Sequence, residues 1–370
     1  MKPKIIAMYL PQFHQIPEND EFWGEGFTDW VTVKNAKPLF KGHQQPRVPM
    51  NENYYDLSIK DNVKWQCKLA KEYGVYGFGI YHYWFNNDKN LLTKPAEIIL
   101  ENDDVDINYF FTWDNVSWKR TWSNVDGNDW APLVDGQNKN SIGPQLLIQY
   151  TLGEEKDWER HYNYVRNHFL SPKYIKKDNN PVFCIMNYSK EIERMCNYWQ
   201  GLARKDGFDG IHYIFKEYRF LNIPSNRYRF CYEPSSSGWD STSIIERIIN
   251  RIKKDFRLNN HLQVRNYDKI WSNLLKKAEK LSTPEYYHGA FVSYDDTPRR
   301  GTNRGIVVVG DSPEKFQSYM RELIKISESQ EKEFIFLTAW NEWGEGAYLE
   351  QDTRHGDEYL LALKHAIGKI

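Results

Sequence analysis

Strand and helix signals alternate through nearly the whole chain, and this feature limits the fold more than any other. Eight short runs are rich in apolar, β-branched or aromatic residues, and several are apolar without interruption. Uninterrupted runs of this kind are typical of strands that are buried on both faces of a parallel sheet. The eight predicted strands cover residues 5–10, 77–84, 107–113, 182–187, 211–216, 228–233, 290–294 and 334–340.

Stretches with helical periodicity separate most of these strands. In the first of them, Ile59, Val63, Cys67 and Ala70 follow one another at spacings of four and three residues, as on one face of a helix. The connection over residues 218–227 is the weak point, because it is too short for an ordinary helix. The predicted helices cover residues 58–73, 158–169, 191–204, 242–256, 267–281, 313–328 and 357–367.

This order of elements predicts a (β/α)8 TIM barrel that occupies residues 1–370 as a single domain. A doubly wound open sheet is the alternative, but the GxGxxG pattern of a dinucleotide site does not follow the first strand. Two aromatic-rich segments, residues 11–57 after the first strand and 114–152 after the third, are too long for plain connections. Loops after barrel strands lie at the face where active sites form, so we expect both to shape a site.

The composition excludes several classes of function. The formal net charge of -1 argues against nucleic-acid binding through bulk charge, and no apolar run is long enough for a membrane helix. The chain has neither a CxxC nor an HExxH pattern, so we expect no metal and no cofactor. Its first apolar run is typical of a strand rather than of a signal peptide, which predicts a cytoplasmic protein. The sequence leaves the oligomeric state open.

The strongest candidate for chemistry is the segment 338–346, where an apolar strand ends in Glu342 and Glu345. Trp340 and Asn341 are their neighbours and are suited to hold the two carboxylates in place. A carboxylate pair in an aromatic pocket is the machinery of glycoside cleavage, in which one member has a raised pKa and donates a proton. The alternative interpretation of this segment is an acidic turn that faces solvent.

Other polar and aromatic residues lie at strand ends or in the first long loop, and we predict that they bind a carbohydrate. We expect Glu342, His82 and Trp113 to converge at one end of the barrel, and the aromatic residues of the first loop to shape a pocket rim. The alternatives are a structural histidine, ion-paired turns and an aromatic plug. The predicted substrate-binding residues are Tyr9, Trp23, Phe27, Trp30, Tyr81, His82, Tyr83, Trp84, Trp113, Asp114, Asn115, Glu217, Glu233, Asp295, Trp340 and Asn341.

Several of these motifs together resemble the WbsX-like family of bacterial polysaccharide proteins, which is related to glycoside hydrolase family 99. The resemblance covers nearly the whole chain and implies a (β/α)8 barrel that is active on glycans. The motifs that carry it are YLPQFH at 9–14, GFTDW at 26–30, YWFN at 83–86, DTPRR at 296–300, AWNEWGEG at 339–346 and YLE at 348–350.

The resemblance also implies roles for the two glutamates in a cleavage that retains anomeric configuration. Glu342 would act as a base on the 2-hydroxyl of the sugar, and Glu345 would be the general acid and base with the raised pKa. One position departs from the family, because Val116 stands where a glutamate is usual. Either Asp114 replaces that glutamate or substrate recognition differs. The alternatives are a glycosyltransferase of lipopolysaccharide O-antigen or capsule synthesis and a non-catalytic glycan-binding barrel.

Overall fold

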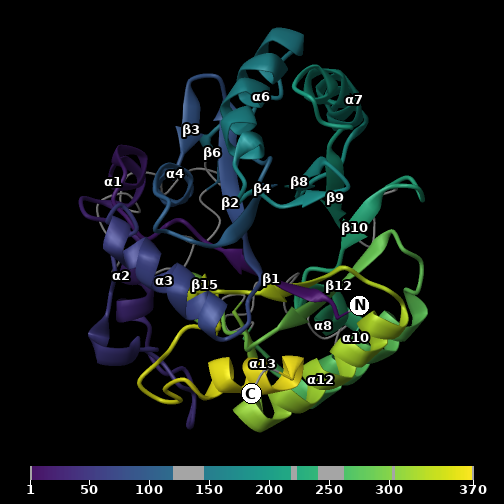
Figure 1. The fold of residues 1–370 in the computed structure, drawn as a ribbon. Coiled ribbons are helices and arrows are strands. Elements are labelled where there is room, and N and C mark those ends of the chain that lie inside the picture. The colour runs from purple at the N-terminus through teal and green to yellow at the C-terminus, as the bar shows by residue number, and fades with distance from the viewer. Residues whose placement is uncertain (1, 120–145, 218–222, 241–261, 302–304, 369–370) are drawn as a thin grey trace, which may run out of the picture.

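A closed barrel of eight parallel strands forms the centre of the molecule, as the sequence predicts (Figure 1). The computed structural model describes residues 2–119, 146–217, 223–240, 262–301 and 305–368. The first strand pairs with the second on one side and with the last on the other, which closes the sheet. The barrel strands are β1 (Lys4–Tyr9), β2 (Gly77–Asn86), β4 (Asn108–Trp113), β8 (Asn180–Ile185), β9 (His212–Lys216), β10 (Tyr228–Phe230), β12 (Tyr286–Phe291) and β14 (Phe334–Thr338).

The strands are buried on both faces, which explains why their sequences are apolar without interruption. All five residues of β14 are buried, and five of the six residues of β1 are buried. Strand β12 begins at Tyr286, four residues before the predicted start. The sequence did not indicate this start, because the first residues of the strand carry polar atoms. One of them, His288, is nevertheless buried, and its Nδ1 lies 2.8 Å from the hydroxyl of Ser327.

Helices surround the barrel, and most follow the predicted periodicity (Figure 1). Ser189 and Ser312 cap two of them by accepting hydrogen bonds from backbone N–H groups in the first turn. The helix predicted over 242–256 lies outside the described residues, and α4 was not predicted. The helices are α3 (Lys60–Glu72), α4 (Lys94–Glu101), α6 (Glu155–Leu170), α7 (Lys190–Lys205), α8 (Ser235–Asp240), α10 (Tyr267–Lys280), α11 (Thr297–Arg300), α12 (Pro313–Ser329) and α13 (Glu358–Ile367).

The long segment after β1 is folded into short helices rather than an open loop. It contains α1 (Pro17–Trp23), α2 (Asp29–Asn35) and the 3-10 turn η1 (Met50–Glu52). Helix α2 packs against the 3-10 turn η2 (Trp343–Glu345), so this segment reaches the end of β14. The remaining short strands are β3 (Lys89–Leu91), β5 (Trp118–Lys119), β6 (Leu146–Ile148), β7 (Lys176–Lys177), β11 (Gln263–Asn266), β13 (Ile306–Val309), β15 (Asn341–Glu342) and β16 (Ala347–Tyr348).

None of the helices in the described part of the chain combines the length and the apolar character that crossing a membrane requires.

Candidate active site

Glu342 and Glu345 lie in a tight turn just beyond the carboxyl end of β14. The turn, residues 341–348, consists of the antiparallel pair β15–β16 with η2 between them, and we call it the glutamate turn. Gly346 ends η2 with a φ of 55°, a conformation that favours glycine. The Asn341 side chain accepts a hydrogen bond from the N–H of Leu10 at 2.7 Å and donates one to its carbonyl at 2.9 Å. These two bonds fix the start of the turn against the end of β1.

The guanidinium group of Arg299 joins the two glutamates. Its Nη2 donates to Glu342 Oε2 at 3.1 Å, and its Nη1 donates to Glu345 Oε1 at 3.0 Å. Its Nε and Nη2 also bind the carboxylate of Asp29 at 3.2 and 3.1 Å. Asp29 in turn accepts a hydrogen bond from the N–H of Gly344, where an added Cβ would lie 2.5 Å from Arg299 Nε. One arginine therefore holds three carboxylates in one buried cluster.

The two glutamates differ in how deeply their side chains are buried. The side chain of Glu342 is 6% exposed, whereas that of Glu345 is 21% exposed. Burial raises the pKa of Glu342 to about 8 against the opposing charge of Arg299, and the charges of Glu345 and Asp29 add to the increase. The sequence-based hypothesis assigned the raised pKa to Glu345. The deeper carboxyl is Glu342, because it lies at the strand end and Glu345 lies on the outer part of the turn.

Tyrosine side chains lie around Glu342, and the half-buried acid Asp114 lies near one of them. The hydroxyls of Tyr81 and Tyr232 lie 2.7 Å apart. Burial raises the pKa of both tyrosines and of Tyr83, and the charge of Glu342 adds to the increase in each. Burial raises the pKa of Asp114 to about 6, and its charge also acts on Tyr83. These side chains therefore form a polar, hydroxyl-rich wall that connects Asp114 to the glutamate turn.

His82, Trp84 and Trp113 face the outer helix layer instead of this wall. His82 Nε2 lies 2.8 Å from His161 Nε2 of α6, and the indole of Trp84 stacks on the same imidazole at 4.5 Å. The Trp113 ring lies 4.8 Å from His161. Side chains alternate along a strand, so Tyr81 and His82 point to opposite faces of β2. His82 and Trp113 occupy paired positions near the carboxyl ends of β2 and β4, at the end of the barrel that carries Glu342, and their side chains contact His161 of α6.

The aromatic residues of the first long loop divide into two groups. Trp23 and Phe27 are buried together in a small apolar cluster separate from the main core, and their role at the pocket rim stays a prediction. Trp30 belongs to the main core and lies 5.4 Å from the ring of Trp343, behind the glutamate turn. Gly24 and Gly26, with φ of 103° and 80°, lie in the turn between α1, which ends at Trp23, and α2, which carries Trp30.

Four predicted residues make contacts that fix loops and strands. Glu217 is 3.4 Å from Arg229 Nη1, as the ion-pair alternative predicts. Glu233 accepts hydrogen bonds from the N–H and hydroxyl of Ser237 at 2.8 Å. The Asn115 side chain pairs with the backbone of residue 187. Asp295 is 2.8 Å from His43 Nε2; burial opposes ionisation of this carboxyl, but the bond from His43 and nearby positive charge outweigh it and lower its pKa.

Two further predicted residues lie in the barrel core beneath the turn. The Tyr9 hydroxyl donates to Gln66 Oε1 at 2.6 Å, and the fully buried Trp340 ring lies 5.5 Å from Phe78. Gln66 donates to Glu350, which also accepts from Tyr55 and from the indole of Trp343. Tyr9 and Trp340 therefore stand below the glutamate turn.

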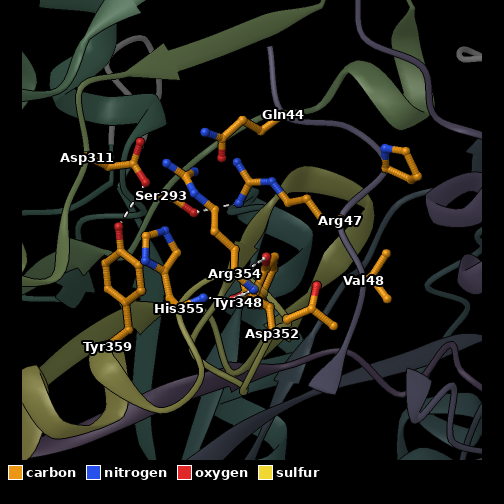
Figure 2. Close-up of a pocket in the computed structure, with 12 residues that line it drawn as sticks. Gln44, Arg47, Val48, Ser293, Asp311, Tyr348, Asp352, Arg354, His355 and Tyr359 are labelled. Atoms are coloured by element: carbon orange, nitrogen blue, oxygen red, sulfur yellow. Dashed lines mark hydrogen bonds between the residues drawn. The ribbon is translucent and has the colours of Figure 1, made fainter. Parts of the chain in front are cut away.

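A small hollow of about 70 Å³ lies behind the outer part of the turn (Figure 2). Arg47 enters it, and its Nη1 donates to Ser293 Oγ at 3.0 Å and to the carbonyl of Gly346 at 2.9 Å. Tyr359 donates to Asp311 at 2.9 Å on the opposite side of the same hollow. These contacts support the glutamate turn from behind.

Arg299, Asp29, Tyr232 and Glu350 were not among the residues predicted for the site. Three of them lie inside motifs that carry the family resemblance, so their sequences held a signal, but their partners are far away along the chain. Arg299 and Asp29, for example, are 270 positions apart. Within the described residues, no group of three or more histidine, cysteine, aspartate or glutamate side chains is arranged to hold a metal ion.

A family model described as Glycosyltransferase WbsX matches residues 5–363. The chain belongs to the WbsX family. It is 30% identical over 374 residues to a protein named uncharacterized protein WxcX from Xanthomonas campestris pv. campestris strain B100. The matched region covers 98% of the chain and 49% of that protein. The WxcX protein of a second strain of this organism is 29% identical. The chain spans about half the length of the curated relatives it matches.

Solved structures share the fold of this WbsX-family chain. A glycoside hydrolase-like protein has a TM-score of 0.57 at 14% identity, with 99% of this chain and 94% of that chain covered. The GH99 endo-alpha-mannosidase from Bacteroides thetaiotaomicron has a TM-score of 0.55 at 11% identity, with 99% and 96% covered. The barrel and the family resemblance predicted from the sequence are confirmed.

Proposed function

We propose that this chain is a single barrel domain that cleaves a bacterial polysaccharide or glycan intermediate with retention of configuration, and that Glu342 and Glu345 are its catalytic residues. The observation that carries the proposal is the pair of carboxylates at the end of β14, joined by Arg299 and bordered by tyrosine hydroxyls. Barrel enzymes carry their chemistry at this end of the strands. A carboxylate pair beside hydroxyl-rich aromatic side chains suits a sugar ring.

The catalytic roles of the two glutamates follow from how deeply each is buried and from the pKa of Glu342. A base that removes a proton from a sugar hydroxyl works best when its pKa is near the working pH, and burial brings the pKa of Glu342 close to neutral. Glu345 is the more exposed of the two, which suits a group that meets a departing sugar or an entering water molecule. Arg299 holds both carboxylates before substrate binds, so they need little rearrangement during the reaction. Asp114 would contact substrate across the tyrosine wall.

Glycosyl transfer is the second candidate, and the description of the matching family favours it. A retaining mechanism uses the same carboxylates for both reactions, because an acceptor sugar takes the place of water in the second step. In this case the enzyme would transfer a sugar during cytoplasmic assembly of lipopolysaccharide O-antigen or capsule. The carboxylate pair and the GH99-like barrel support hydrolysis or transglycosylation equally.

Variants of the two glutamates test the proposal on glycans with good and poor leaving groups. General acid catalysis contributes about 10²- to 10⁴-fold. Glu345→Gln should therefore lose kcat/KM on natural glycosides much more than on activated aryl glycosides, whereas Glu342→Gln should lose it on both. Equal losses for Glu345→Gln would contradict its role as the acid. Full activity of both variants would refute the proposal and leave a glycan-binding barrel or other catalytic residues.

A further inference from the structure

A hollow of about 560 Å³ lies beside Trp343, the residue that follows Glu342 in the glutamate turn. A cavity of this volume lies within the range of small-molecule binding sites. It is bounded by the segment 49–55, by Trp65 of α3 and by the residues 350–351 that follow the glutamate turn. Its lining includes neither Arg299 nor Asp114, so the hollow is distinct from the cluster around Glu342.

Aromatic rings form one part of the lining. Tyr54 and Trp65 are partly buried and line the hollow together with the buried Trp343. The Tyr54 ring is held in place, because the edge of Trp30 meets it at 5.2 Å and the ammonium of Lys34 lies 4.0 Å from its centre. Fixed rings lose little conformational freedom when a flat ligand face stacks on them.

Amide and carboxylate groups form the rest of the lining. Asn51, Asn53 and Gln351 supply both donors and acceptors, and Glu52 supplies a carboxylate. Asn51 and Glu52 are consecutive residues with φ of 57° and 53°, a left-handed conformation that asparagine adopts readily but that is costly for Glu52. The surrounding backbone holds this turn, since the N–H of Met50 donates to the carbonyl of Gln351 at 3.0 Å. Strained backbone of this kind concentrates at binding and catalytic sites.

Glu350 connects the floor of the hollow to the glutamate turn. Its Oε2 accepts from the Tyr55 hydroxyl and from Trp343 Nε1, both at 2.7 Å, and its Oε1 accepts from Gln66 at 2.6 Å. The motif that contains Glu350 carries part of the family resemblance, and the proposed reaction gives it no role. The floor is therefore a built polar network that links this hollow to Trp343.

We propose that the hollow binds a neutral segment of a glycan as a second site beside the glutamate turn. A pyranose ring stacks its C–H face on an aromatic ring, and its hydroxyls bind amides and carboxylates, which matches both parts of the lining. The lining has the carboxylate of Glu52 and no lysine or arginine, so a neutral sugar is favoured over a uronic acid. The inference rests on the proposed function only in that the ligand is a glycan.

Binding measurements on the whole chain test the site. The probes are an array of defined neutral oligosaccharides and their uronic-acid counterparts, followed by titration of the neutral oligosaccharides that bind, with tryptophan fluorescence as the readout. Loss of a stacking ring should weaken binding about tenfold, so Tyr54→Ala and Trp65→Ala should each raise the Kd by this factor. Trp65→Phe keeps a ring and should stay within about threefold of the wild type. Melting temperatures verify that each variant is folded.

Three results would overturn the site: no neutral glycan binds, uronic acids bind more tightly, or folded Tyr54→Ala and Trp65→Ala bind as tightly as the wild type. Glu342→Gln separates this inference from the proposed reaction, because Glu342 does not line the hollow. This variant should bind neutral glycans with the Kd of the wild type, and Tyr54→Ala and Trp65→Ala should weaken its binding by the same factor as in the wild type. Glycan binding that depends on Trp65 in an enzyme without turnover would refute the reaction alone. Turnover that depends on Glu342 without binding at the hollow would refute the site alone.

Discussion

At the scale of single residues, the central question is what the buried carboxyl of Glu342 does. Burial raises its pKa to about 8, so most molecules carry the protonated form at neutral pH. A base acts only when it is deprotonated. We therefore predict that kcat/KM rises with pH and levels off above about pH 8, because this parameter reports groups of the free enzyme. A pH profile measured on an activated glycoside tests this. A fall of kcat/KM through pH 8 would instead make Glu342 the acid.

Arg299 acts on the same group as a positioning residue. Its charge opposes the increase in the pKa of Glu342, and its planar fork reaches Glu342, Glu345 and Asp29 together. Arg299→Lys keeps the charge but loses the fork, and small displacements of catalytic groups cost up to about 100-fold in rate. We expect kcat/KM to fall by about 10- to 100-fold, with the rise near pH 8 little changed.

Arg299→Gln is the matched comparison. It also removes the charge, so the pKa of Glu342 should increase and the rising limb of the profile should move to higher pH. Stability should fall by about 3–5 kcal/mol, because the buried side chains of Asp29 and Glu342 and the half-buried Glu345 lose their common partner. Urea unfolding measures this loss. If kcat/KM rises with pH at the same midpoint in the wild type and in Arg299→Gln, the proposed effect of Arg299 on the pKa of Glu342 is contradicted.

At the scale of elements, Glu350 joins three parts of the fold through hydrogen bonds. Gln66 comes from α3, Tyr55 from the segment after η1, and Trp343 from η2. Burial raises the pKa of Glu350 from 4.5 to about 7, so the folded chain holds its proton more tightly than the unfolded chain. The stability that this group contributes is therefore present below about pH 4.5 and is lost as the pH rises to about 7.

Glu350→Gln should remove this part of the pH dependence. A glutamine fits the network if the amide of Gln66 turns over, since the Tyr9 hydroxyl can donate or accept. We predict that the wild type loses up to about 3 kcal/mol relative to Glu350→Gln between pH 5 and pH 8. Both proteins should carry Glu342→Gln, because the raised pKa of that residue contributes with the same sign. Parallel melting temperatures across this range would contradict the prediction.

At the scale of the whole molecule, the sequence predicts the barrel well because the strands obey a local rule. A strand covered on both faces must be apolar along its length, and β14 is fully buried. The glutamate turn was also predicted, because both glutamates lie within one short segment. The sequence does not predict toward which face of its strand each side chain points. His82 and Tyr81 are neighbours, yet only the fold decides which one borders Glu342 and which one contacts α6.

The site depends most on contacts between distant segments, which single-sequence patterns do not carry. Arg299 meets Asp29 across 270 positions and meets Glu342 across 43. Two arginines that closely follow two aspartates in the sequence are typical of an ion-paired turn. Arg300 makes such a local ion pair with Asp296 at 2.9 Å. Only the closed barrel brings Arg299 to the end of β14. The ion-paired interpretation of residues 295–300 is therefore correct for one arginine and incomplete for the other.

The arrangement of the whole site also predicts the stereochemistry of the reaction. Inverting glycosidases separate their carboxyl groups to leave room for a water molecule between them, whereas retaining enzymes hold them closer. Here one guanidinium group bridges Glu342 and Glu345 at 3.1 and 3.0 Å, so the two carboxyls share a single small partner. We predict that the first product keeps the anomeric configuration of the substrate, and that an excess of acceptor sugar diverts part of the product to transfer.

Proton NMR of the product, recorded before mutarotation, measures the configuration, and mass spectrometry of reactions with and without acceptor measures transfer. Glu342→Gln is the control, because any product formed without the base comes from another route. A first product of inverted configuration would contradict the bridged pair as the reacting groups. Retention with efficient transfer but slow hydrolysis would mean that the barrel builds glycans with the machinery of a glycosidase, since the same two carboxylates serve water and sugar acceptors alike.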